Sequence, residues 1–177
     1  MTSSPRERTR AELERWFDEL LAAYGSALGR LAASYTRSAA EQEDLVQEIA
    51  LAIWGALPHF RGECSERTFL FRIAHNRALA HVARRRLPLA ESDAIPEIED
   101  ATPDPEAALS SEQEGRLLMA AIQRLPVAYA QVVTLMLEGM TYQEIAEVLG
   151  ISETNVGARL TRGRDMLRRL LRSANAG

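Results

Sequence analysis

The sequence predicts an all-α protein made of two small helical domains joined by a flexible acidic linker. Apolar residues recur every three or four positions along most of the 177 residues, which is the period of amphipathic helices. Residues 87–105 break this period with four prolines and many acidic residues, as is typical of a linker. No segment alternates convincingly between polar and apolar residues, as a half-buried strand would. We therefore expect domains at residues 9–86 and 106–173.

The first domain is expected to hold three helices. The opening helix spans roughly residues 9–34. The second follows a capping box, in which Ser38 and Glu41 satisfy N–H groups of the first turn, and it ends at Pro58. A loop then leads to a third helix, which contains Phe69 and runs on to residue 86.

Neither composition nor motifs indicate an enzyme, a cofactor or a metal site. His59, His75 and His81 lack metal-ligand spacing with acids or cysteine, and the sequence has no phosphate-cradling glycine loop. We expect His75 and His81, within a basic helix, to lie at the surface or to contact nucleic acid. Cys64 is the one cysteine and cannot form an internal disulfide. The sequence also lacks an apolar run of about 20 residues and a leader, so we expect a cytoplasmic protein without membrane insertion.

The charge of the chain is unevenly distributed. The formal net charge is −4, and every basic residue is an arginine. Between residues 91 and 114 there are nine acidic residues and no basic one. The arginines flank this stretch in two blocks, one of Arg72, Arg77, Arg84, Arg85 and Arg86 and one of Arg159, Arg162, Arg164, Arg168, Arg169 and Arg172. Such a chain can bind phosphate locally although it is acidic overall.

The C-terminal part of the sequence has the features of a helix-turn-helix. Thr141 and Glu144 form a capping box that starts its first helix. Gly150 falls where the turn requires a left-handed residue. Ser152 caps the second helix, which begins there. These residues stand at the offsets that a helix-turn-helix needs.

The second helix of such a motif enters the major groove of DNA. A simpler alternative is an αα-hairpin with a charged outer face, but the arginines that follow the motif favour DNA binding. Arg159 and Arg162 are the residues from which we expect base or phosphate contacts. The full expected DNA-binding set of this helix is Glu153, Thr154, Gly157, Ala158, Arg159, Thr161 and Arg162.

Several stretches of the first domain form a recognisable set. They are Glu43-Asp-Leu-Val-Gln-Glu48 with Ile53-Trp54, then Phe60-Arg-Gly62, then Phe69-Leu-Phe-Arg-Ile-Ala-His-Asn76. This set resembles the first conserved domain of extracytoplasmic-function (group IV) RNA polymerase sigma factors. The second domain, with Leu125-Pro126 and the helix-turn-helix, resembles their −35-binding domain. The resemblance covers most of the chain outside the N-terminal residues and the linker.

The resemblance implies a sigma factor, which binds core RNA polymerase and directs promoter-specific initiation by recognising −10 and −35 elements and aiding promoter melting. It assigns binding of core polymerase to Asp44, Leu45, Gln47 and Glu48. It assigns binding of −10 DNA to Phe60, Arg61, Glu66, Arg72, Asn76 and Arg77. Binding of −35 DNA falls to the recognition-helix set given above. The habit of the family, together with the lack of a sensory domain, also implies an anti-sigma factor as a partner.

Some positions depart from the pattern of the family. Gly157 and Ala158 stand where a basic residue and a serine are frequent, which predicts an altered or weaker preference at the −35 element. Glu66 stands where some members carry an aromatic residue, and Phe69 replaces the usual tryptophan. An alternative from another functional class is a transcriptional regulator that binds operators without polymerase. The acidic and amide face from residue 44 to 48, together with Asn76, favours the sigma factor, because a simple repressor does not need these groups.

Overall fold

The computed structural model describes residues 8–86 and 111–174. These two ranges contain seven α-helices, one short 3-10 helix and no strand, which confirms the predicted all-α class. The expected linker, residues 87–105, lies outside the described residues, as do residues 106–110 of the expected second domain. No helix of the described ranges has the length and apolar character needed to cross a membrane.

The N-terminal unit is built from three long helices. They are α1 (Arg10–Ala33), α2 (Ala39–Ala56) and α3 (Glu66–Arg86), with the 3-10 helix η1 (Leu57–His59) after α2. Thr9 and Glu12 form a capping box at the start of α1. The start of α2 differs from its prediction: Ser38 accepts the N–H of Glu41, but the Glu41 carboxylate accepts the N–H of Arg37 instead of completing the box. Pro58 lies in η1, where α2 has already ended.

The three helices enclose one apolar core. Each contributes side chains spaced three or four residues apart, as the sequence pattern predicts. The almost fully buried members are Leu20, Leu28 and Leu31 of α1, Leu45, Ile49 and Ile53 of α2, and Leu70, Phe71, Ala74 and Ala78 of α3.

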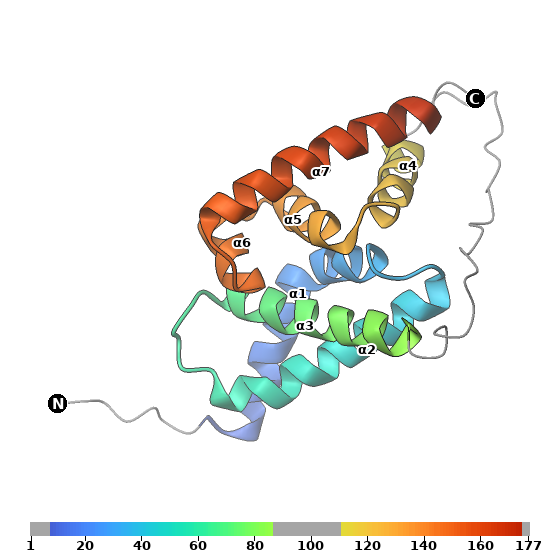
Figure 1. Cartoon of the computed structure of the whole chain (residues 1–177). Helices are drawn as coiled ribbons and strands as arrows, with labels where there is room; N and C mark the ends of the chain where they lie inside the picture. Colours follow the sequence, from blue (N-terminus) through green and yellow to red (C-terminus); the bar gives the residue numbers. More distant parts are fainter. Residues whose placement is uncertain (1–7, 87–110, 175–177) are drawn as a thin grey trace.

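The C-terminal unit contains the helix-turn-helix. Its helices are α4 (Ser111–Gln123), α5 (Val127–Leu137), α6 (Tyr142–Leu149) and α7 (Glu153–Ala174). Helix α7 runs the length of this unit and contacts α4, α5 and α6 (Figure 1). Its core includes Ile122, Leu125, Val132, Leu135, Ile145, Val148, Val156 and Leu160.

The two units lie against each other. Helix α6 of the C-terminal unit packs along α3 of the N-terminal unit, near the start of α3 (Figure 1). The sequence gives no indication of this contact, because the residues that make it are far apart in the chain.

Gly163 allows α7 to lie close to α5. A Cβ atom at this position would stand 2.9 Å from Cγ2 of Val133 and 3.4 Å from Cβ of Tyr129. Val133 is buried and β-branched, so its methyl group has little freedom to move aside. The approach of the two helices therefore requires a residue without a side chain at position 163.

We predict that Gly163→Ala destabilises the protein. Overpacking costs about 1–3 kcal/mol, which offsets or exceeds the gain of about 1 kcal/mol that alanine brings to a helix. Gly25→Ala in α1 is the matched control, because a Cβ there has no neighbour within 4 Å and should stabilise the helix. Urea unfolding of both variants measures the difference. Equal stability of the two variants would contradict the close packing of α5 and α7.

Candidate nucleic-acid interface

The exposed side of α2 carries one surface of predicted function. Asp44 and Gln47 are exposed, and Glu48 is half-buried and paired with Arg84 of α3, whose Nη2 lies 2.9 and 2.7 Å from the two carboxylate oxygens. Leu45 was predicted to contact core polymerase, but the structure does not place it at the surface. It is fully buried in the core, so it holds α2 in place and presents nothing to a partner.

Sequence reasoning missed another exposed residue on this face. Leu51 is 72% exposed and follows Gln47 by one helical turn. It falls outside the buried stripe of α2, so the same period that located the core would have placed it at the surface. We call Asp44, Gln47, Glu48 and Leu51 the α2 surface. An exposed leucine within a polar surface is suited to bury apolar area against a partner protein.

Aromatic side chains shape the loop between η1 and α3. The ring of Phe60 lies 4.6 Å from that of Phe69 and 5.7 Å from that of Trp16, centroid to centroid. Trp16 also donates its Nε1–H to a carboxylate oxygen of Glu66 at 2.8 Å. Gly62 has a φ of 73°, which lets the loop turn at low steric cost. These contacts fix the loop on α1 and on the start of α3.

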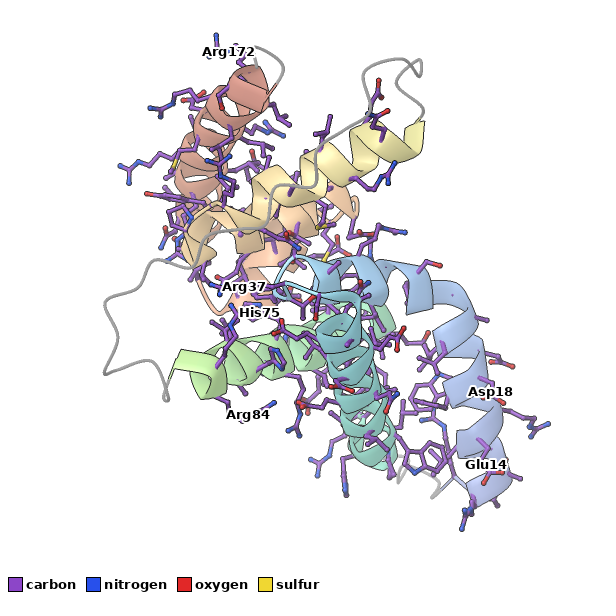
Figure 2. All side chains as sticks on the ribbon, turned by 90° about the vertical axis from the view of Figure 1, so that its right-hand side faces the viewer. Glu14, Asp18, Arg37, His75, Arg84 and Arg172 are labelled. Atoms are coloured by element: carbon purple, nitrogen blue, oxygen red, sulfur yellow. The ribbon has the colours of Figure 1, made fainter. Side chains whose placement is uncertain are left out.

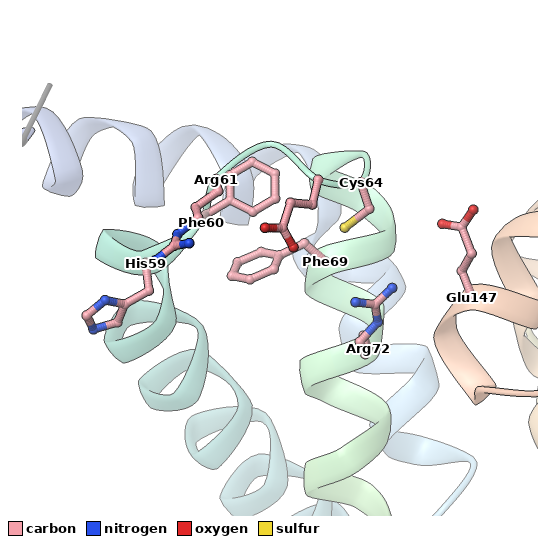
Figure 3. A pocket seen from close by; sticks show the side chains of 8 residues that line it. His59, Phe60, Arg61, Cys64, Phe69, Arg72 and Glu147 are labelled. Carbon is pink, nitrogen blue, oxygen red and sulfur yellow. The ribbon is translucent and has the colours of Figure 1, made fainter. Parts of the chain in front are cut away.

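An open hollow of about 590 Å³ lies beside this loop. Figure 3 shows Phe60, Phe69, Arg72 and Glu147 around it. Its lining residues are His59, Phe60, Arg61, Glu63, Cys64, Phe69, Arg72 and Glu147. The hollow thus combines aromatic rings with guanidinium groups, which is the chemistry that binds unstacked bases and their phosphates. One of its walls comes from the other unit, because Glu147 belongs to α6.

The structure brings together only some of the residues predicted to bind −10 DNA. Phe60, Arg61 and Arg72 line the hollow. Asn76 and Arg77 are exposed further along α3, and Asn76 follows Arg72 by one turn on the same face. Glu66 is not a lining residue, because Trp16 holds its carboxylate on the side of α1.

His75 does not lie where the sequence reasoning placed it. The side chain is buried, and its Nδ1 lies 3.2 Å from the hydroxyl of Tyr35, also buried. A neutral ring can accept the phenolic hydrogen at Nδ1. Burial lowers the pKa of His75 to about 4 and raises the pKa of Tyr35. His75 therefore joins the middle of α3 to the turn that follows α1 inside the core, and it does not contact nucleic acid.

The helix-turn-helix has the local geometry that its sequence predicts. Thr141 and Glu144 form the capping box of α6, and Gly150 adopts the left-handed conformation with a φ of 66°. The Ser152 hydroxyl accepts the N–H of Asn155 at 3.2 Å, and Val156 is buried. The recognition helix, α7, is therefore anchored at its N-terminus and along its inner side.

The outer side of α7 is available to a ligand. Glu153, Thr154, Ala158, Thr161 and Arg162 are exposed, whereas Gly157 and Arg159 are half-buried. Arg159 donates its Nε–H to the side-chain oxygen of Asn155 at 3.1 Å. Asn155 is exposed, and sequence reasoning missed it. Gly157 lies against the ring of Tyr142, where a Cβ would be 3.4 Å from Cε2.

No three His, Cys, Asp or Glu side chains in the described parts of the chain are grouped so that they could hold a metal ion. The candidate interface comprises arginine, amide and aromatic groups on α3, the preceding loop and α7, and an acidic and apolar surface lies on α2.

We predict that His75 makes stability fall with acid. The unfolded chain binds the histidine proton below its ordinary pKa of about 6.5, whereas the folded chain does so only near pH 4. Between these values stability should fall by up to about 1.4 kcal/mol per pH unit. Above pH 6.5 this contribution should be constant.

The measurement is urea unfolding of the wild type and of His75→Gln at pH 7 and pH 5. Carboxylate effects are common to both proteins, so they cancel in the difference. The wild type should lose about 2 kcal/mol more than the variant. Parallel losses would show that His75 titrates normally in the folded state.

Comparison with known proteins gives consistent matches along the chain. Residues 20–87 match the model of Sigma-70 region 2, and residues 115–167 match that of Sigma-70, region 4. RNA polymerase sigma factor NccH of Alcaligenes xylosoxydans xylosoxydans is 32% identical over 89% of this chain and 88% of its own. The ECF RNA polymerase sigma-E factor of Escherichia coli is 30% identical over 91% of this chain and 89% of its own.

Two solved structures share the fold. CnrH, in complex with the cytosolic domain of CnrY, is 28% identical, covers 90% of each chain and superposes with a TM-score of 0.66. The sigma factor RpoE of Bartonella quintana, in complex with the anti-sigma factor NepR, has a TM-score of 0.73 at 22% identity. That match covers 88% of this chain and 96% of the other.

Proposed function

The chain belongs to the extracytoplasmic-function sigma factors of RNA polymerase, and we propose that it directs transcription from its own set of promoters by binding core polymerase and two promoter elements. One observation carries this proposal. The same chain combines a helix-turn-helix with the α2 surface and with the exposed side chains of Arg72, Asn76 and Arg77 on α3. A regulator that acts without polymerase needs only the first of these.

We assign residues 9–86 to the domain that binds core polymerase and −10 DNA, and residues 106–173 to the domain that binds −35 DNA. Residues 87–105 would connect them. The family matches over residues 20–87 and 115–167 support this division.

The α2 surface is the proposed contact with core polymerase. Asp44 and Gln47 offer exposed polar groups on one face, and Leu51 adds apolar area between them and the end of the helix. Burying a leucine of this kind contributes about 1.5–3 kcal/mol when the partner covers it fully. Glu48 would have to exchange Arg84 for a group of the partner, so its net contribution is small.

The hollow beside the loop and the exposed side of α3 form the proposed −10 site. Phe60 offers an aromatic ring for stacking, and Arg72 a guanidinium for a phosphate or a base. Asn76 is exposed one turn further on, where its amide can pair with the edge of an unstacked base. Holding a base out of the stack costs a few kcal/mol, which the stacking and phosphate contacts offset.

The outer side of α7 is the proposed −35 site. Arg162 is exposed and free to extend, whereas Arg159 is held along the helix by Asn155. We therefore infer that Arg162 makes the stronger contact with DNA. Gly157 and Ala158 add little side-chain surface to the outer side of α7, which supports a reduced −35 preference.

As a transcription initiation factor the protein is not itself an enzyme. Because two solved relatives were each captured with a partner, CnrY and the anti-sigma factor NepR, we propose that an anti-sigma factor also binds this chain. A cytoplasmic location follows from the same function, since core polymerase acts there.

Run-off transcription with purified core polymerase tests the function. Promoters are first identified by sequencing transcripts started by the reconstituted enzyme. Leu51→Ala combined with Gln47→Ala should weaken binding to core polymerase about tenfold or more, because the partner loses both apolar and polar contacts. Glu14→Ala on the exposed side of α1 is the control. Wild-type protein that binds the promoters but never core polymerase would identify an operator-binding regulator instead.

A second prediction concerns the salt dependence of −35 binding. Each phosphate contact contributes a slope of about −0.9 to the plot of log affinity against log salt concentration. Arg162→Ala should therefore weaken binding to −35 duplex DNA and reduce the slope by about one if its contact is with a phosphate. Arg168→Ala is the control, because Arg168 is paired with Asp165 at 3.0 Å and lies further along α7. An unchanged slope together with relaxed sequence preference would assign Arg162 to a base.

A further inference from the structure

Trp16 of α1 lies against the loop that borders the hollow. Thr9 and Glu12 cap the start of α1, so the first turns of this helix are anchored. Glu14 and Asp18 are exposed and mark the outer side of the helix (Figure 2). Trp16 is two residues from each of them, which places it on the opposite side. The cap and the helical period together direct the indole toward the loop.

Contacts on several sides fix the indole of Trp16. Its Nε1–H donates to a carboxylate oxygen of Glu66 at 2.8 Å. Its ring lies 5.7 Å from the ring of Phe60, centroid to centroid. The guanidinium carbon of Arg8 lies 4.0 Å from the centroid of the indole. Because the aromatic and cation–π contacts set the orientation of the ring, its N–H is aimed at Glu66.

The Trp16 indole decides where the Glu66 carboxylate lies. Glu66 begins α3, and Phe69, which lines the hollow, follows it by three residues on the same side of the helix. Within the described ranges the Glu66 carboxylate has no hydrogen-bond or ion-pair partner other than the indole. Without this partner, rotation about its side-chain bonds would allow the carboxylate to turn toward the hollow.

The charges around the hollow leave little room for a further carboxylate. Its charged lining residues are two arginines and two glutamates, whose formal charges cancel: Arg61, Arg72, Glu63 and Glu147. A Glu66 carboxylate turned toward the hollow would add an excess negative charge and would attract one of the arginines. That guanidinium would then be less available to a phosphate. Retention of Glu66 by Trp16 therefore favours binding of nucleic acid.

We propose that Trp16 is a positioning residue of the −10 site: its indole N–H holds the Glu66 carboxylate away from the hollow and leaves the arginines there to DNA. This inference rests on the proposed function for the identity of the site. Trp16 and Glu66 act without touching the DNA. An acidic residue of the loop thus serves to anchor the loop on α1, and its charge is kept from the surface that binds phosphate.

The test separates the N–H of Trp16 from its ring. Trp16→Phe keeps an aromatic ring beside Phe60 but removes the donor, which releases Glu66. Glu66→Gln keeps an acceptor for the indole and carries no charge. The double variant has neither the donor nor the charge. Trp54→Phe is the matched control, because Trp54 is the other tryptophan of the chain and lies in α2, with its ring edge-on to Phe17.

The first readout is the proton resonance of the Trp16 indole N–H in the free protein, which is identified by its loss in Trp16→Phe. A hydrogen bond to a carboxylate moves such a resonance downfield. Glu66→Ala should therefore move it upfield, and Trp54→Phe should leave it in place. Urea unfolding verifies that every variant is folded. Trp16→Phe and the double variant should have similar stabilities, because both lack the same hydrogen bond.

The second readout is binding of a single strand, carrying the −10 sequence of an identified promoter, by the full chain assembled with core polymerase. Trp16→Phe should weaken binding on the order of tenfold at low salt, because a released carboxylate competes with phosphate for an arginine. The defect should shrink as salt rises, since screening weakens this competition. Glu66→Gln, the double variant and Trp54→Phe should bind as the wild type does.

Different results would overturn the inference in different ways. Normal binding by Trp16→Phe would show that the indole N–H does not matter to the site. Weak binding by Glu66→Gln alone would show that the carboxylate itself contacts DNA. A defect that persists in the double variant would assign the loss to packing of the loop and not to charge.

Failure of the wild type to bind core polymerase or the −10 strand would contradict the proposed function and this inference with it. The indole resonance distinguishes that case, because its upfield shift in Glu66→Ala would still show that Trp16 holds Glu66, in a purely structural role.

Discussion

The burial of Leu70, Phe71, Ala74 and Ala78 along one side of α3 fixes which side chains of that helix can reach a ligand. Because these residues recur at helical spacing and pack on α1 and α2, the opposite side of α3 must face outward. Arg72 and Asn76 stand on that side, one turn apart. The same helix also carries α6 of the other unit, so core packing, nucleic-acid contact and contact between units all depend on its orientation.

Apolar and polar interactions both join the two units of this molecule. The buried apolar side chains of the two units form one cluster, and an ion pair and hydrogen bonds to backbone carbonyls connect the units in addition. Separating the units would therefore expose apolar area as well as polar groups.

The recognition helix shows how packing decides the chemistry of a surface. Tyr142 begins α6, and a Cβ atom at position 157 would stand in van der Waals contact with its ring, so α6 borders the outer side of α7. Asn155 holds Arg159 by a hydrogen bond, which leaves Arg162 as the exposed arginine of the first three turns. The reading surface is therefore set partly by α6, although α6 contacts no base in such a motif.

The sequence by itself determined the all-α class, the cap of α6, the left-handed Gly150 and the buried stripes, because each depends on neighbours three or four residues apart. It also identified the family, through motifs of the same short range. Only the tertiary structure decided that Leu45 and His75 are buried, that Leu51 is exposed beside Gln47, and that Glu147 shares a hollow with Arg72. The contacts between Arg30 and Glu138 and between Gln123 and the end of α1 belong to the same group. These features join residues as much as 108 positions apart through polar groups, and polar pairs leave no period in a sequence from which their partners could be predicted.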